Sequence, residues 1–183
     1  MHSGKLMLAA TAAILSLAPA ARAASPVSDD EVKSLVERFG GDSIRQREDF
    51  HRHPELSNPE TRTAEIVAKQ LKALGLEVQT GIARTGVVGI LRGGKPGKIV
   101  ALRADMDALP VTEKVDLPFR SQARGTYQGR EVDVMHACGH DVHTAALLGT
   151  ASILASAKDR IPGTVMFIFQ PAEEGPPPGE KAA

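Results

Sequence analysis

The sequence predicts an α/β sandwich in which helices pack on a sheet and polar sites lie at strand ends. Two observations support this fold class. Apolar residues recur at helical spacing in two segments before residue 75 and in a third after residue 140. Short β-branched runs, separated by Gly and Pro, lie between these segments, and one more apolar run follows the third. Such alternation is typical of layered α/β domains, in which ligands bind beside the strand ends.

Two helices are expected in the first part of the chain. The first covers residues 29–50, and we expect it to be broken or to resume at the "GGD" sequence of residues 40–42. The second has Asn58 as its expected N-cap, Pro59 at the first helical position and Gly75 at its end. Its apolar face consists of Ala64, Val67, Leu71 and Leu74.

Strand-like runs follow the second helix. Three of them, "LEVQT", "TGVVGILRG" and "GKIVALRADM", cover residues 76–80, 85–93 and 97–106. The sequence "GGKPGK" at residues 93–98 predicts a hairpin turn between the last two, and its spacing does not fit a phosphate-binding loop. A third helix is expected over residues 141–157. The nearly continuous apolar run at residues 163–170 predicts a strand covered on both faces.

The overall charge excludes one large class of partner. The chain has 22 basic and 22 acidic residues, one Tyr and no Trp. It therefore lacks both the basic surface and the stacking aromatic residues of proteins that bind nucleic acids, and we expect no nucleic-acid partner.

Residues 1–23 predict a cleavable signal peptide. A lysine precedes the uncharged run of residues 6–18, and small residues lead to an expected cleavage site after Ala23. A membrane-spanning helix needs about 20 apolar residues, and this run ends sooner, at Pro19, so we expect no stable membrane anchor. The mature domain, residues 24–183, is expected in the periplasm or secreted.

Pairs of carboxylates follow two of the predicted strands. Asp105 and Asp107 come directly after the apolar "IVAL" run, and Glu173 and Glu174 come directly after "VMFIF". Acidic side chains are rarely buried without partners, so these four are expected where the sheet opens into a cleft. Either pair alone is more often a cap or part of a solvated loop.

A cluster of metal-binding residue types lies in "MHACGHDVHTAALLG", residues 135–149. Cys138 and His140 flank one glycine, so their side chains converge only if the backbone turns sharply there. Thiolate, imidazole and carboxylate ligands suit zinc or a similar divalent ion. The alternative is a cysteine nucleophile with His140 or His143 as its base. Because Cys138 is the only cysteine, a disulfide within the chain is excluded.

Four sequence strings resemble those of the metallopeptidase-type amidohydrolases, which include aminoacylases, hippurate hydrolase and the indole-acetyl-amino-acid hydrolases. They are "HRHPELS", "ALRADMDALP", "MHACGHDVHTAALLG" and "GTVMFIFQPAEEG", in this order. The resemblance implies a three-layer sandwich with a mixed sheet and helices on both faces. It also implies two divalent metal ions (Zn, Mn or Co), which hydrolyse the amide bond of an N-acyl amino acid.

The resemblance also implies roles for individual residues. Cys138, His140 and Glu174 correspond to metal ligands, and Glu173 corresponds to the general base that takes a proton from the attacking water. Asp107 corresponds to a residue that orients the ligands.

Five further residues have less defined roles. Asp105 stands where distant relatives have a metal-binding histidine, so its role stays open. His136 and His143 belong to the motif, and we expect structural hydrogen bonds for them. His51 and His53 are expected to cap or buttress the next helix.

The chain departs from this family in one respect, because no histidine follows His143. Family members supply two further histidine ligands downstream, and a smaller inserted lid domain that often forms a homodimer. We therefore expect the chain to be the N-terminal part of a longer exported hydrolase, inactive by itself. The alternatives are a non-catalytic or degenerate metal-binding remnant and, third, a cysteine-nucleophile hydrolase.

Overall fold

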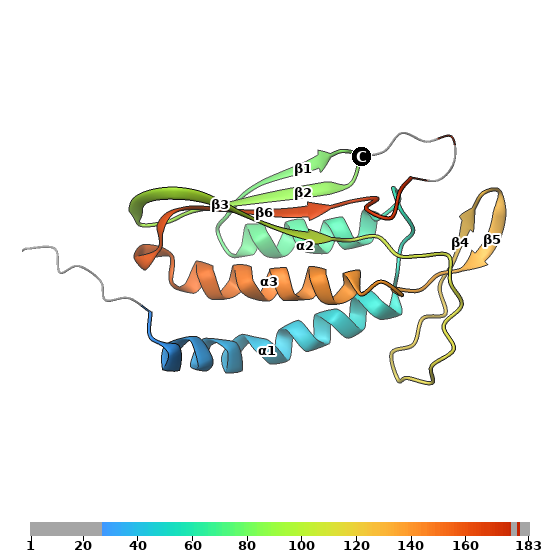
Figure 1. Ribbon diagram of the computed structural model, residues 1–183, viewed down its shortest axis with the longest axis horizontal. Coiled ribbons are helices and arrows are strands. Elements are labelled where there is room, and N and C mark those ends of the chain that lie inside the picture. Colours follow the sequence, from blue (N-terminus) through green and yellow to red (C-terminus); the bar gives the residue numbers. More distant parts are fainter. Residues whose placement is uncertain (1–26, 177–178, 180–183) are drawn as a thin grey trace, which may run out of the picture.

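The computed structural model describes residues 27–176 and 179, and the signal peptide expected at residues 1–23 lies outside them. A four-stranded sheet lies on two successive layers of helices (Figure 1). The first layer contains α2, Thr61–Ala73, and α3, His140–Ser156, and the second is α1, Asp29–Arg52. A separate hairpin, β4 (Arg124–Tyr127) with β5 (Arg130–Asp133), projects at one end. None of the described helices is long and apolar enough to cross a membrane.

Helix α1, Asp29–Arg52, is continuous, so the expected break at residues 40–42 is wrong. The Ser28 hydroxyl caps its first turn by accepting a hydrogen bond from the Glu31 N–H at 3.3 Å. Packing on α3, His140–Ser156, keeps the glycine segment helical. The two helices lie so close that a Cβ added to Gly149 would be 2.3 Å from the Ser43 hydroxyl oxygen. Tertiary contact thus overrides the weak helix propensity of glycine.

Helix α2, Thr61–Ala73, begins later than the sequence suggested. Asn58 is not its N-cap, because the backbone of Asn58 is left-handed with a φ of 79°. The carboxylate of Glu55 performs this function by accepting hydrogen bonds from the N–H groups of Arg62 at 2.9 Å and Thr63 at 2.8 Å. The cap therefore comes from a residue in the preceding loop.

The sheet has the strand order β1-β2-β6-β3. Its strands are β1 Glu77–Ile82, β2 Gly86–Arg92, β3 Lys95–Asp105 and β6 Pro162–Gln170. Strand β6 is antiparallel to β2 and parallel to β3. The predicted hairpin at residues 93–98 is therefore wrong, because β6 lies between β2 and β3. Short-range turn residues do not reveal a strand inserted from later in the chain.

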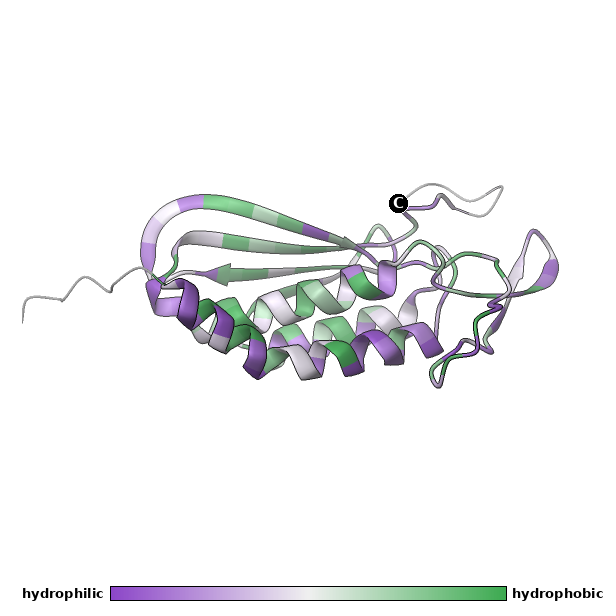
Figure 2. Cartoon of the chain, turned by 60° about the horizontal axis from the view of Figure 1, so that its bottom comes forward, coloured by the Kyte–Doolittle hydropathy of each residue, from purple (hydrophilic) through white to green (hydrophobic). Residues whose placement is uncertain are grey.

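The core lies between the sheet and the α2–α3 layer. Buried and half-buried residues alternate along β6, so one face lies on the core, and the expected cover on both faces is not found within the described residues. The fully buried side chains include Leu71, Leu148, Phe167 and Phe169. In Figure 2 hydrophilic residues recur along α1, the outermost helix, while the strands are mostly hydrophobic.

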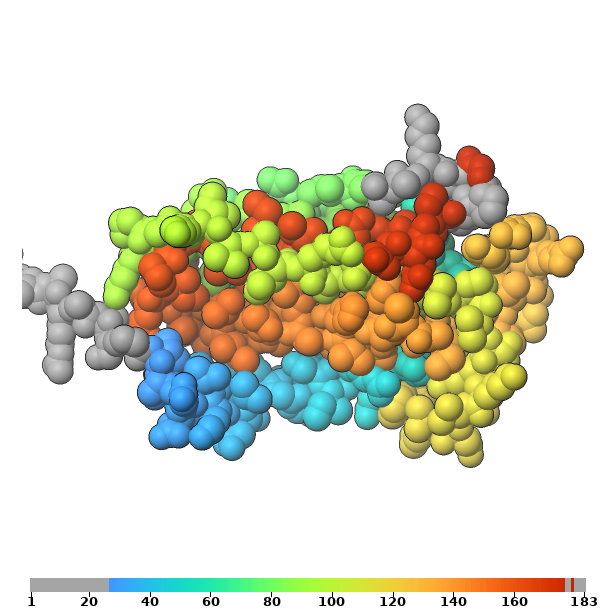
Figure 3. All heavy atoms as spheres, viewed as in Figure 1, coloured from blue at the N-terminus to red at the C-terminus, as the bar shows by residue number. Residues whose placement is uncertain are grey.

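The other face of the sheet is open in the described part of the chain. Met166 and Ile168 of β6 are half-buried on this face, and Ile99 of the edge strand β3 is 71% exposed. Figure 3 shows β3 along the surface above α3 and α1. The α/β fold with a mixed sheet is confirmed, but within residues 27–176 the helices cover one face and not both.

Strand directions bring the predicted polar clusters to one end of the molecule. Because β3 and β6 are parallel, they finish side by side, with Asp105 paired to Gln170. Helix α3 begins at the same end, and so does the loop that leads to β4, Arg124–Tyr127, and β5, Arg130–Asp133 (Figure 1).

Candidate metal centre

The backbone turns sharply between Cys138 and His140, as their spacing requires. Gly139 has φ 85° and ψ 19°, a left-handed conformation that disfavours a side chain, and α3 starts at the next residue. This turn directs the side chains on both sides of the glycine toward the ends of β3 and β6.

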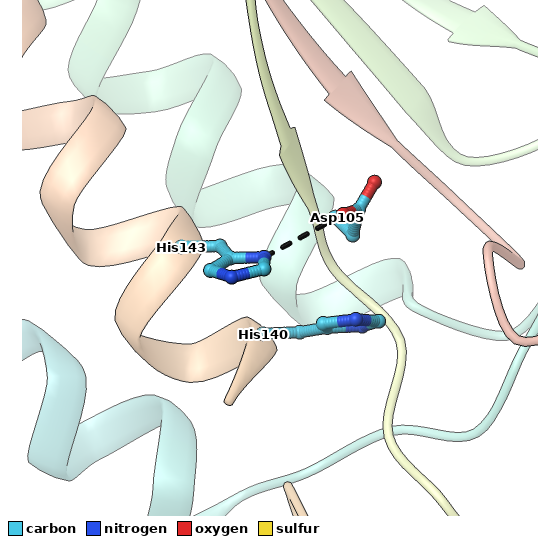
Figure 4. A group of neighbouring side chains, drawn as sticks. All are labelled: Asp105, His140 and His143. Atoms are coloured by element: carbon cyan, nitrogen blue, oxygen red, sulfur yellow. Dashed lines mark ion pairs between the residues drawn. The ribbon is translucent and has the colours of Figure 1, made fainter. Parts of the chain in front are cut away.

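Two groups of possible metal ligands meet at this point. The ligand atoms of Cys138, His140 and Glu174 lie within 4.8 Å of one another, and so do those of Asp105, His140 and His143. Figure 4 shows the second group, with His140 and His143 extending from the first turns of α3 toward Asp105 at the end of β3. The two groups share His140, so two sets of donors adjoin.

His140 is held in an orientation suited to metal binding. Its Nδ1 lies 2.8 Å from the carbonyl oxygen of Asp107 and 3.2 Å from the Oδ1 of the same residue. Both are acceptors, so Nδ1 carries the proton and donates it, and Nε2 keeps its lone pair for a ligand. Nε2 lies 3.7 Å from the Glu173 Oε2 and 3.9 Å from the Glu174 Oε1. Burial alone would lower the pKa of His140, but the hydrogen bond with Asp107 and the charge of that carboxylate raise it.

Asp107 links the strand ends to one another. Only 1% of this residue is exposed, and its carboxylate accepts hydrogen bonds from the Ser57 hydroxyl at 2.8 Å and from the backbone N–H groups of Glu173 and Glu174 at 3.1 Å each. Burial alone would raise the pKa of Asp107, but the hydrogen bonds from His140, Ser57 and the two N–H groups lower it. One anionic group thus contacts both His140 and the glutamate pair.

The cysteine thiol is exposed and surrounded by carboxylates. A hydrogen bond with Glu174 raises the pKa of Cys138, and burial and the charges of Glu174, Glu173 and Asp105 add to this. A cysteine nucleophile needs the opposite shift, toward the thiolate. The surroundings of Cys138 therefore favour a metal ligand, because a bound cation would offset the repulsion between thiolate and carboxylates.

Arg103 is the cation beside the glutamate pair. Its Nη2 lies 2.8 Å from the Asp105 Oδ1 and 3.6 Å from the Glu173 Oε1. The Glu173 carboxylate therefore lies between Arg103 and His140, on the open side of the site.

The two remaining motif histidines differ from one another. The His143 Nδ1 lies at an ion-pair distance of 3.5 Å from the Asp105 Oδ2, and its ring stacks on that of His140. For His136 the expectation of structural hydrogen bonds is wrong: the residue is buried, and neither ring nitrogen has a partner among the described residues. Burial lowers the pKa of His136 to about 4, so the ring is neutral at physiological pH.

Sequence reasoning missed a buried charge cluster behind the site. His51 is 4% exposed, with Nδ1 2.9 Å from the Asp141 Oδ2 and Nε2 3.1 Å from the Glu113 Oε1. Arg47 also pairs with the Asp141 Oδ2, at 2.9 Å. The cluster joins α1 to the first turn of α3, directly after His140, so the expected role of His51 at the next helix is wrong.

His53 and Glu113 complete the description of this region. The His53 Nδ1 contacts the carbonyl oxygen of Asp49, in the last turn of the preceding helix α1, at 2.9 Å. Burial alone would raise the pKa of Glu113, but the N–H of Ser121 and the ring and charge of His51 lower it. Nothing in the sequence "HRH" indicates that its first histidine, His51, is buried and its second, His53, is exposed.

Known proteins with similar sequences are hydrolases. Residues 101–183 match the peptidase family M20/M25/M40. The chain is 51% identical over 149 residues to thermostable carboxypeptidase 1 of Saccharolobus solfataricus, an alignment that covers 76% of this chain and 36% of that protein. It is 44% identical over 148 residues to an N-acyl-L-amino acid amidohydrolase of Geobacillus stearothermophilus, covering 81% and 38%. The chain thus spans little more than a third of the length of these curated relatives.

A solved structure agrees with the fold described above. The YXEP protein of Bacillus subtilis, described as a dinuclear metal binding peptidase, superimposes with a TM-score of 0.67 and 41% sequence identity. The match covers 75% of this chain and 37% of that protein. The resemblance inferred from the four sequence strings is confirmed.

Proposed function

Since the chain belongs to the peptidase family M20/M25/M40, we propose that it forms part of a metal-dependent catalytic centre that hydrolyses the amide bond of N-acyl amino acids. The observation that carries this proposal is the convergence of Cys138, His140 and Glu174 within 4.8 Å, with the Glu173 carboxylate beside them.

The donor set fits divalent ions of intermediate softness. Cys138, His140 and Glu174 would hold one ion, and Asp105 and His143, which lie beside His140, offer donors for a second. One thiolate with imidazole and carboxylate ligands suits Zn²⁺, Co²⁺ or Mn²⁺. The Nδ1–H of His140, donated to Asp107, provides the outer hydrogen bond that metal-bound histidines normally have.

In this proposal Glu173 moves the proton and other residues orient it. Bound divalent cations supply Lewis acidity, which polarises the amide carbonyl and makes a water molecule more acidic. Glu173 accepts the proton of this water on its carboxylate and then donates it to the departing amine. The charge of Arg103, 3.6 Å from the Glu173 Oε1, restrains this carboxylate. Asp107 holds the backbone of Glu173 by accepting a hydrogen bond from its N–H.

The substrate class and the location rest on other observations. The Geobacillus stearothermophilus relative is an N-acyl-L-amino acid amidohydrolase, and we propose the same kind of small substrate for the protein that contains this chain. Export is proposed from the sequence of residues 1–23 alone.

A non-catalytic metal-binding protein is the second candidate. The small number of donors for two ions favours this candidate. Among the described residues these donors are Cys138, His140 and Glu174, with Asp105 and His143. It differs from the enzyme in one measurable way, because it binds metal without turning over any N-acyl amino acid.

The test is a metal titration followed by an activity assay. We expect Co²⁺ to bind the chain with a thiolate charge-transfer absorption band, and chelation to remove that band. The assay uses N-acetyl, N-benzoyl and N-indoleacetyl amino acids, with the chain and with any longer product of the same coding sequence. Hydrolysis that stops in chelator and returns with metal supports the enzyme, whereas metal binding without hydrolysis in either product supports the second candidate. Full activity in chelator overturns both.

A further inference from the structure

Glu60 is a buried carboxylate that neither the sequence motifs nor the proposed mechanism uses. It directly precedes α2 and has an exposed fraction of 0%. A fully buried carboxylate needs partners for both oxygens, since leaving either unsatisfied is costly. The partners of Glu60 therefore indicate what it stabilises.

Each oxygen of Glu60 is engaged. Oε1 accepts hydrogen bonds from the backbone N–H groups of Asn58 at 2.9 Å and Ala172 at 2.8 Å, and Oε2 accepts one from the Thr85 hydroxyl at 2.5 Å. The bond to Ala172 crosses 112 residues of sequence. Burial raises the pKa of Glu60, and the hydrogen bonds from Thr85, Ala172 and Asn58 offset this only in part.

The contact with Ala172 reaches the loop that carries the glutamate pair. Ala172 has a φ of 48°, an unfavourable left-handed conformation for a residue with a side chain. Its N–H goes to Glu60, while the next two, of Glu173 and Glu174, go to Asp107. Three successive N–H groups are thus held by two buried carboxylates from different parts of the chain.

We propose that Glu60 is a positioning residue that holds the turn at residues 171–174 so that Glu173 and Glu174 face Cys138 and His140. This rests on the proposed function, since it assigns Glu60 a role in orienting a proposed ligand and a proposed base. Glu60 belongs to neither group of possible metal ligands among the described residues, and its oxygens accept hydrogen bonds from Asn58, Thr85 and Ala172. It acts through the backbone of Ala172.

The hydrogen-bond pattern predicts which substitutions preserve this role. In Glu60→Gln the amide oxygen still accepts both N–H groups, and the new NH₂ group donates to the Thr85 hydroxyl oxygen, which also has acceptor capacity. In Glu60→Asp the carboxylate is one methylene shorter and does not reach Ala172, although the charge remains. The two variants therefore separate the effect of charge from the effect of side-chain length. Glu60→Gln loses the charge and should keep the turn, whereas Glu60→Asp keeps the charge and should release the turn.

A matched control comes from Thr85. Thr85→Val removes one hydrogen bond of the same carboxylate and leaves the bond to Ala172 intact. If Glu60 had a purely structural role, Thr85→Val and Glu60→Asp would affect the turn at residues 171–174 in the same way. The proposal predicts that only Glu60→Asp affects the turn at residues 171–174.

The experiment compares the 183-residue chain with these three variants by amide hydrogen exchange and by Co²⁺ titration. In Glu60→Asp we expect the amide of Ala172 to exchange about tenfold faster, as for one lost hydrogen bond, and Co²⁺ to bind roughly 10- to 100-fold more weakly, as when outer partners of a metal site are lost. Glu60→Gln and Thr85→Val should match the wild type in both measurements. Far-UV circular dichroism identifies folded variants.

The outcomes separate this inference from the proposed function. Wild-type exchange at Ala172 in Glu60→Asp, or a Co²⁺ affinity that is unchanged while the wild type binds Co²⁺, overturns the positioning role. If the wild type itself does not bind Co²⁺, the proposed metal centre fails, and exchange at Ala172 still decides whether Glu60 holds the turn. If Glu60→Asp does not fold, Glu60→Gln remains decisive, since faster exchange in it contradicts the rescue.

Discussion

The Nδ1 atom of His51, near the end of α1, lies 2.9 Å from the Oδ2 atom of Asp141 in the first turn of α3. Its other ring nitrogen, Nε2, lies 3.1 Å from the Glu113 Oε1, so the ring lies between two buried carboxylates. All three side chains are at most 4% exposed. The start of α3, and with it His140, is therefore fixed to α1 by buried charges and not by apolar packing alone.

Replacing His51 should destabilise the protein strongly. His51→Ala leaves Asp141 and Glu113 buried with fewer partners, and we expect a loss of about 3 kcal/mol in the free energy of unfolding. His53→Ala is the matched control, because that side chain is 46% exposed and its Nδ1 contacts Asp49 of the preceding helix α1; it should cost less than about 1 kcal/mol. Urea denaturation measures both, and equal losses would contradict the importance of the buried cluster.

Replacing Gly139 should strain the backbone and weaken metal binding. Nothing lies within 4 Å of a Cβ built at this residue, so Gly139→Ala tests conformation and not space. We expect a loss of about 1 kcal/mol in stability and weaker Co²⁺ binding, with a smaller effect for Asn, which tolerates left-handed backbone. Gly129→Ala, in the β4–β5 turn with a φ of 72° and equally open space, should lose similar stability but bind Co²⁺ normally. Normal Co²⁺ binding by Gly139→Ala would show that this turn does not position the ligands.

Cys138 should behave as a ligand and not as a nucleophile. Bound Zn²⁺ or Co²⁺ should protect its thiol from alkylation by iodoacetamide, and Cys138→Ser should lose the thiolate–Co²⁺ absorption band. The rate of alkylation with and without metal, measured by mass spectrometry, gives the answer. Alkylation that proceeds equally fast with saturating metal would exclude Cys138 from the ligand set.

The two adjacent glutamates should differ in what they contribute. Glu174→Gln should lower the amount of metal bound, whereas Glu173→Gln should leave it unchanged. In an active longer product, Glu173→Gln should reduce kcat by on the order of 10³-fold, as for the loss of a general base. Metal content by atomic absorption distinguishes them, and the reverse pattern would exchange the two assignments.

The sequence predicted those features that depend on local patterns. The helix expected over residues 141–157 is observed at His140–Ser156, and both carboxylate pairs lie at strand ends, because apolar periodicity and turn residues are local properties. The insertion of β6 between β2 and β3 and the contact between Glu60 and Ala172 depend on distant segments. No spacing in the sequence encodes such partners, so the hairpin was predicted wrongly and Glu60 was missed.

The raised pKa of Glu60 predicts a specific dependence of stability on pH. A carboxyl whose pKa is higher in the folded than in the unfolded state binds its proton more tightly when the protein is folded. The free energy of unfolding therefore falls as the pH rises from the unfolded value of 4.5 through the folded pKa. Glu60→Gln does not titrate and should gain stability over the wild type across this interval, by about 1.4 kcal/mol per unit of raised pKa. Melting temperatures from pH 4 to 8 measure the difference. A gain that shrinks with rising pH would contradict the sign of the shift.

The central place of β6 determines the order in which the sheet can form during synthesis. The β1–β2 hairpin pairs neighbouring segments and can form early, but β2 and β3 have no partner in common until residues 162–170 have been made. Until then each presents an unpaired edge, and exposed strand edges are templates for association between chains. Formation of the β2–β6 pair, which joins Arg92 to Thr164 and Val87 to Phe169, closes the longest loop in the sheet and is therefore expected to be slow. The same strand that brings Glu173 and Glu174 to the site thus makes the newly made chain dependent on protection, by chaperones or by low concentration, until β6 is in place.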